Sequence, residues 1–146
     1  YVFITGSYNF GAKLAKVGAT GSVEIWQSDD VMSSQYTTCI QHEKTLIGIH
    51  GRQDEGLASL RCIDPKTKRI LWTETDFGYA TSIKADGKLV ILKTDGTLVL
   101  AAASKTGYKE LSSHKVLDSG ARALPALSNG LLYVRDAKTL KCLDIR

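Results

Sequence analysis

Short runs of apolar residues alternate with polar turn pairs along the whole chain. Residues 88–93 and 97–102, for example, are rich in Val, Ile, Leu and Thr and are separated by the pair Asp95-Gly96. Short apolar runs bounded by turn residues are typical of β-strands, and no stretch keeps a helical period for three turns. Asp-Gly suits a tight hairpin, because Gly adopts positive φ freely and Asp tolerates it. The pattern therefore predicts an all-β fold built from hairpins.

This pattern repeats along the chain. Leu46, Leu89 and Leu132 lie at successive steps of 43 residues, and residues 140–144 repeat residues 60–64 almost letter for letter. A period of this length is in the range of four-stranded propeller blades, in which each repeat forms one small antiparallel sheet. We therefore expect a β-propeller of four-stranded antiparallel blades.

The repeats divide the chain into four units, at about residues 1–35, 36–78, 79–120 and 121–146. In the third unit, strands are predicted at residues 81–85, 88–93, 97–102 and 108–112. The first unit lacks its innermost strand and the last unit lacks its outermost strand. Residues 1–146 are thus expected to form a single partial domain, an arc of about four blades from a ring of about seven or eight.

Residues 62–72 have the most distinctive sequence of the repeated segments. Residues 62–72 hold an apolar strand end, a turn that contains Pro65 and a second strand that closes on Trp72. Looser copies of this segment lie at residues 101–111 and 19–26.

Residues 62–72 resemble the blade signature of the pyrroloquinoline-quinone-type (PQQ-like) β-propellers, which is an apolar strand, Asp-x-x-Thr-Gly, three residues and then Trp. Lys68 stands in place of the Gly, and Leu111 stands in place of the Trp in the third unit. The first unit has one extra residue before Trp26. The resemblance implies that Trp26, Trp72 and Leu111 pack between neighbouring blades. It also implies a periplasmic or secreted protein.

The resemblance implies the fold without implying a cofactor. Family members that oxidise alcohols use a quinone, a calcium ion with Glu, Asn and Asp ligands, a catalytic Asp and commonly an adjacent Cys-Cys pair. None of these features can be placed in the chain. We therefore predict no catalytic residue, and we expect a quinone only if the complete ring supplies its site.

The histidines and cysteines give no sign of a metal site. His42, His50 and His114 are scattered without the spacing of a zinc site. The cysteines Cys39, Cys62 and Cys142 form no CxxC pair. Because free cysteine is among the residues most often found inside proteins, we expect these three side chains to be buried thiols.

Charge and hydropathy narrow the choice of partners. The net charge is +4, but Lys and Arg are spread over turns and alternate strand positions, so no nucleic-acid groove is predicted. The apolar run at residues 98–103 is far shorter than the roughly 20 residues of a membrane-spanning helix. We also expect any targeting signal to lie outside this sequence, which opens without a basic leader.

Two loops are candidates for an interaction surface. Segments 6–11 and 51–56 are framed by glycines and hold matched positions in the first two units, so a propeller would place them on the same face. The alternative is that they are surface insertions without a role. The candidate interaction residues are Tyr8, Asn9, Phe10, Arg52, Gln53, Asp54 and Glu55.

The sequence thus favours a non-catalytic scaffold or recognition module for protein–protein interaction, resembling propellers of this class that assist outer-membrane protein assembly. One alternative is a fragment of a quinone-dependent dehydrogenase whose cofactor site lies in the missing blades. A third is a structural repeat unit that self-associates. Because an open arc exposes an apolar face at each end, we expect the remainder of a longer propeller chain, or a homo-oligomer, as its partner.

Overall fold

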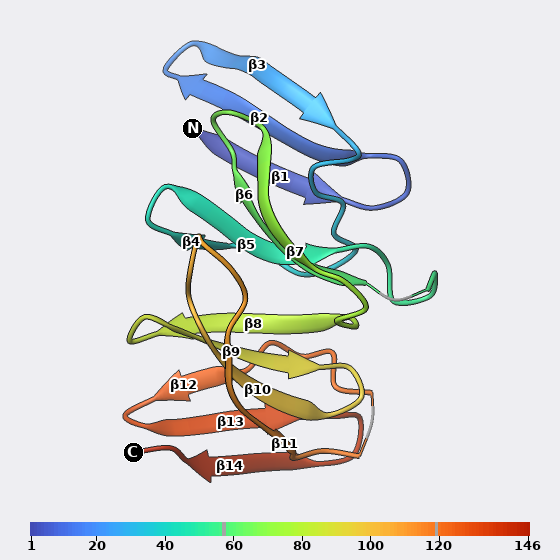
Figure 1. The fold of residues 1–146 in the computed structure, drawn as a ribbon, viewed down its shortest axis with the longest axis vertical. Coiled ribbons are helices and arrows are strands. Elements are labelled where there is room, and N and C mark those ends of the chain that lie inside the picture. The colour runs from blue at the N-terminus through green and yellow to red at the C-terminus, as the bar shows by residue number, and fades with distance from the viewer. Residues whose placement is uncertain (57, 119) are drawn as a thin grey trace.

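The computed structural model describes residues 1–56, 58–118 and 120–146. Over these residues the protein is all-β, without a helix, and its fourteen strands form four antiparallel sheets. The sheets follow one another in chain order along the longest axis, with the two termini toward opposite ends (Figure 1). The prediction of an all-β fold is confirmed.

Each sheet is a meander in which strands that are neighbours in sequence pair with each other. The first sheet consists of β1 (Val2–Gly6), β2 (Gly11–Gly18) and β3 (Gly21–Ser28). The second consists of β4 (Ile40–His42), β5 (Thr45–His50), β6 (Ser59–Asp64) and β7 (Arg69–Glu74).

The third sheet consists of β8 (Ala80–Ala85), β9 (Lys88–Lys93), β10 (Thr97–Ala102) and β11 (Glu110–Lys115). The fourth consists of β12 (Ala126–Ser128), β13 (Leu131–Arg135) and β14 (Leu140–Asp144). These strand numbers agree with the numbers that the repeats predict for each unit. The fourth strand of the third sheet, however, begins and ends later than the predicted 108–112.

The two inner sheets bury apolar side chains on both faces, which explains why their strands read as continuous apolar runs. Successive residues of a strand point to opposite faces of the sheet. In β5, Leu46 and its partner Ile63 pack toward the first sheet, whereas Ile47 and its partner Cys62 pack toward the third. Each inner sheet is thus covered from both sides.

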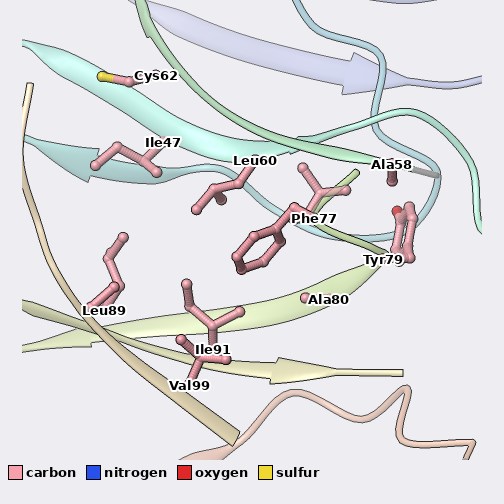
Figure 2. Packing of buried hydrophobic residues seen from close by; sticks show 12 residues of the cluster. Ile47, Ala58, Leu60, Cys62, Phe77, Tyr79, Ala80, Leu89, Ile91 and Val99 are labelled. Carbon is pink, nitrogen blue, oxygen red and sulfur yellow. The ribbon is translucent and has the colours of Figure 1, made fainter. Parts of the chain in front are cut away.

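Three apolar clusters join the four sheets in a row. The first cluster lies between the first and second sheets and contains Met32 and Ile63. The largest lies between the second and third sheets, where the ring of Phe77 sits between Leu60 and Ile91 (Figure 2). The last cluster lies between the third and fourth sheets and contains Val90, Leu92, Leu117, Ala121, Leu132 and Val134.

The outer faces of the two end sheets carry exposed apolar side chains. Val2 and Ile4 of the first sheet are each 47% exposed, and Leu140 of the fourth sheet is 70% exposed. The prediction that Cys142 is a buried thiol is wrong, because this side chain is exposed. Cys142 pairs with Tyr133 as Cys62 pairs with Ile47, but only Cys62 has a further sheet packed on its face.

Candidate interaction surface

The two tryptophans make matching contacts with the next sheet. The indole Nε1–H of Trp26 in β3 donates a hydrogen bond to the carbonyl oxygen of Pro65, at 2.8 Å. The indole Nε1–H of Trp72 in β7 donates to the carbonyl oxygen of Ser104, at 2.9 Å. Both acceptors lie in the connection between the last two strands of the following sheet. Each half-buried indole therefore joins two sheets by packing and by a hydrogen bond.

Lys68 adds to the first of these contacts. Its backbone φ is 62°, which lies in the left-handed region that favours glycine. Its ammonium group lies 5.9 Å from the centre of the Trp26 ring, within the range of a cation–π interaction. The side chain thus covers the indole that reaches the turn from the first sheet.

The strand register places Ser112, and not Leu111, at the position of these tryptophans. Trp26 pairs with Leu14 and Trp72 pairs with Cys62, and in both sheets a β-bulge follows the pair. In the third sheet the residue that pairs with Leu100 beside the bulge is Ser112. We call Trp26, Trp72 and Ser112 the docking positions of the first, second and third sheets.

The prediction that Leu111 packs between sheets is replaced by this assignment. Leu111 is the bulge residue, and its side chain is 45% exposed. The connection from Ala101 to Glu110 is two residues longer than the equivalent connection from Ile63 to Ile70. One of the two extra residues lies before Thr106 and the other lies after it. An alignment that matches Thr106 with Thr67 and keeps equal spacing therefore ends at Leu111, one place before the docking position.

The first of the two candidate loops is a tight turn. It joins β1 to β2 through residues 7–10, and both Tyr8 and Asn9 have positive φ, of 61° and 65°. Asn tolerates this conformation, whereas a bulky residue such as Tyr is held in it at a cost of about 1 kcal/mol. Tyr8 must therefore be fixed by contacts with its surroundings.

Residues 29–39 join β3 to β4 and cross from the first sheet to the second, and this crossing segment positions both loops. The backbone N–H of Ser34 donates to the Thr5 hydroxyl at 3.1 Å, and the N–H of Gly51 donates to the carbonyl oxygen of Ser33 at 2.7 Å. Ser34 and Gly51 also form a parallel β-bridge. The crossing segment thus pins the ends of β1 and β5 next to each other, where the two loops begin.

The two loops lie side by side and touch. The guanidinium carbon of Arg52 lies 4.3 Å from the centre of the Tyr8 ring. Gln35 from the crossing segment donates through Nε2 to the Tyr8 hydroxyl at 2.9 Å and to Oδ1 of Asp54 at 3.3 Å. The structure therefore brings the sequence-predicted residues together in one cluster. We call the following residues the loop surface: Tyr8, Asn9, Phe10, Gln35, Tyr36, Arg52, Gln53, Asp54 and Glu55.

Ion pairs hold the second loop. Arg52 contacts Asp54 at 2.5 Å and Glu55 at 2.7 Å. The hydrogen bond with Asp54 raises the pKa of Arg52, and the same bond lowers the pKa of the Asp54 carboxyl. These shifts keep Arg52 and Asp54 charged at neutral pH, and the second loop holds two carboxylates, of Asp54 and Glu55, against one guanidinium.

Tyr36 extends the loop surface toward the third sheet. Its ring centre lies 4.5 Å from that of Tyr79, and its hydroxyl donates to Oε1 of Gln53 at 2.8 Å. The buried Tyr79 hydroxyl accepts the backbone N–H of Tyr36 at 2.8 Å. Burial, followed by the effect of Tyr79, raises the pKa of the Tyr36 phenol. Tyr36 is thus a neutral and rigidly held aromatic side chain.

A groove of about 400 Å³ runs from Arg52 toward the third sheet. Lys93 lies over the ring of Phe77 in this groove, 4.2 Å from the ring centre. Four carboxylates and two cations lie on the loop surface and along this groove, so the combined surface is acidic. The negatively charged residues are Asp54, Glu55, Asp76 and Asp95, and the positively charged residues are Arg52 and Lys93.

His50 has a structural role at the base of the loop surface. Its Nδ1 accepts the backbone N–H of Ser33 at 3.1 Å. Burial, followed by the positive charge of Arg61, lowers the pKa of His50 to about 4, against the smaller opposite effect of Asp30. The ring is therefore neutral at physiological pH and acts as a hydrogen-bond acceptor.

The remaining candidate groups do not gather into a chemical site. Burial raises the pKa of the Cys39 thiol to about 12 and also raises the pKa of Cys62. Among the described residues, no group of three or more His, Cys, Asp or Glu side chains is arranged to hold a metal ion. Nor does any helix of membrane-spanning length and hydropathy occur in the part of the chain that the structure describes.

No protein-family model and no curated protein matches the chain. The assignment of the loop surface as a candidate interaction site therefore depends on the contacts described above. Sequence reasoning selected seven of its residues but missed Gln35 and Tyr36, which bridge the loops from the crossing segment. A polar pair between two units carries no periodic signal, so no pattern in the sequence marks it.

Proposed function

We propose that the chain is an arc of a β-propeller of the PQQ-like repeat class and that it acts as a non-catalytic recognition module, which binds a protein partner through the loop surface. The observation that carries this proposal is the direct contact between the two loops, with Arg52 stacked on the exposed ring of Tyr8. Tyr and Arg are the residue types that most often dominate binding energy at protein interfaces.

Pre-organisation of the loop surface supports a binding role. Tyr8 is 65% exposed, yet its ring is fixed by Arg52 and its hydroxyl by Gln35. A partner that binds this surface pays little to order side chains that are already held in place. Surface insertions without a role have no comparable reason to keep a Tyr at positive φ.

The charge of the surface indicates the chemistry of the partner. The loop surface itself carries the carboxylates of Asp54 and Glu55 against the single guanidinium of Arg52, and its three aromatic side chains, Tyr8, Phe10 and Tyr36, all expose part of their rings. An acidic surface with aromatic side chains is complementary to a basic segment that also carries apolar or aromatic residues. We therefore expect the partner to present Lys or Arg next to such residues.

Selection from a random peptide library displayed on phage tests this function. Peptides selected on the parent protein should be enriched in Lys, Arg and aromatic residues and should lose at least about tenfold in affinity for the Tyr8→Ala, Arg52→Ala double variant. Tyr133→Ala, which removes an exposed aromatic ring from the fourth sheet, is the matched control and should bind as the parent does. Peptides that bind the double variant and the parent equally would refute the loop surface as the binding site.

The outer faces of the end sheets support the proposal that the all-β fold is part of a β-propeller. Each sheet packs face to face on the next, and the exposed Val2, Ile4 and Leu140 lie on end sheets that have only one neighbouring sheet. We propose that further blades cover these faces, supplied by a longer chain or by second copies of this chain. Residues 1–146 alone should then self-associate at micromolar concentration in light scattering. A well-folded monomer under those conditions contradicts this part of the proposal.

A further inference from the structure

An open cavity of about 620 Å³ lies between the third and fourth sheets. Smaller cavities, of about 310 Å³ and 360 Å³, lie at the interface of the first and second sheets and at that of the second and third sheets. The walls of the large cavity are mainly apolar and come from both sheets: Val90, Leu98 and Leu100 from one, and Leu127 and Leu132 from the other.

The vacant docking position explains the size of this cavity. Ser112 lines it at the position where the first and second sheets each carry a tryptophan. Ile145 lines the cavity as well, three residues after Cys142, just as Pro65 stands three residues after Cys62. The carbonyl of Pro65 accepts the indole N–H of Trp26. The cavity thus lies where the repeat would place an indole ring.

We propose that this cavity binds a small, neutral aromatic molecule of the indole type, whose ring N–H donates a hydrogen bond to the segment that follows β14. The flat ring would contact the leucine walls as the tryptophan rings contact the clusters at the other two interfaces. The volume is within the range of small-molecule sites in proteins, about 300–1,000 Å³. This site rests on the strand register and is independent of the proposed function.

The charges around the cavity favour a neutral ligand. Asp86 and Lys88, which both line the cavity, have opposite charges. The guanidinium of Arg146 is engaged by Asp144 at 2.6 Å. The opposite charges of these four residues offset one another, so burial of an apolar ring is the main source of affinity.

Titration with free indole, followed by amide chemical shifts of the 15N-labelled protein, tests the site. Indole should produce saturable shifts confined to the cavity walls, around Ser112, Leu100 and Leu132. Benzofuran has the same shape without the N–H donor and should bind about fivefold more weakly, because one hydrogen bond is lost. The absence of saturable binding up to the solubility of indole overturns the proposal, and so does equal affinity for the two probes.

Two variants locate the binding in the cavity. Ser112→Trp places an indole in the cavity and should weaken the binding of free indole at least about tenfold. Ser113→Trp is the matched control, because Ser113 pairs with Val99 on the opposite face of the same sheet, and it should leave the affinity unchanged. If Ser112→Trp disturbs the fold, Ser112→Leu fills part of the same space and should show the same direction. Unchanged affinity in a folded filling variant overturns the proposal.

Discussion

The second sheet packs against the first and the third sheets, and the third sheet packs against the fourth. The strand register is the same at these three interfaces, but the side chain at the docking position differs. Trp26 and Trp72 reach from their own sheet to the carbonyl of a residue in the next. Ser112 stands at the same register position and leaves a cavity of about 620 Å³. The backbone repeat is thus independent of the residue that fills the docking position.

The interface between the third and fourth sheets, which we call the third interface, also shows how closely two sheets pack without an indole. Leu92, Leu132 and Val134 are at most 2% exposed there, so the facing strands pack closely even beside the cavity. Apolar pairing between the middle strands holds the sheets together, and the indole adds area and one hydrogen bond at the edge. The difference between the interfaces is therefore one of strength.

The largest effect is expected from removal of an indole that is present. Trp72→Ala deletes a large half-buried ring and leaves the Ser104 carbonyl without its donor. We expect a loss of about 3 kcal/mol in the free energy of unfolding, measured with urea. A loss below about 1 kcal/mol would remove the energetic distinction between the interfaces.

Acid should weaken the interface of the first and second sheets through His50. Its folded pKa of about 4 is below its ordinary value, so the unfolded chain binds the proton more tightly. The stabilisation is complete above about pH 6.5 and is lost as the pH falls through the window down to about 4. The loss should reach about 2 kcal/mol after allowance for solvent screening.

His50→Gln keeps a hydrogen-bond acceptor without the titration, and it is the control for this pH effect. Between pH 6.5 and 4.5 the variant should lose clearly less stability than the parent in urea unfolding curves. Parallel pH profiles for the two proteins would show that His50 does not carry the effect.

Filling the vacant docking position should make the third interface resemble the other two. Ser112→Trp is expected to raise the free energy of unfolding by about 1 kcal/mol, because it buries an apolar ring in existing space. Ser113→Trp, on the other face of β11, should change stability by less than about 0.5 kcal/mol. Destabilisation by Ser112→Trp alone would mean that the third interface is built differently.

The smallest expected effect tests whether strand register or spacing in sequence identifies the docking residue of the third sheet. Leu111 is the bulge residue and is 45% exposed, so Leu111→Ala should cost no more than about 0.5 kcal/mol. A cost near that of Trp72→Ala, measured by the same urea titration, would restore Leu111 as the docking residue.

The sequence predicted the sheets better than it predicted the contacts between them. Apolar runs and Asp-Gly turns mark strands through local geometry, so the meanders and their strand numbers follow from the pattern. The identity of the docking residue depends on a bulge and on the length of the connection from Ala101 to Glu110. Neither is visible to an alignment by equal spacing, which therefore selected Leu111.

Burial and bridging contacts show the same limit. Cys62 and Cys142 have the same sequence context, but only Cys62 is covered by another sheet, so local pattern alone predicts both as buried. The candidate loops were placed together from their matched positions in two units. Gln35 and Tyr36, which tie these loops together, act through long-range hydrogen bonds that no local pattern encodes.

Exchange of the indole N–H protons in the Ser112→Trp variant tests the central claim, that one docking position recurs in three sheets. In the parent, the indole N–H signals of Trp26 and Trp72 should exchange slowly with deuterated water, because both donate to carbonyls of the next sheet. The variant should show a third slowly exchanging indole signal. A third signal that exchanges as fast as free indole, beside two protected ones, would contradict the equivalence of Ser112 with the two tryptophans.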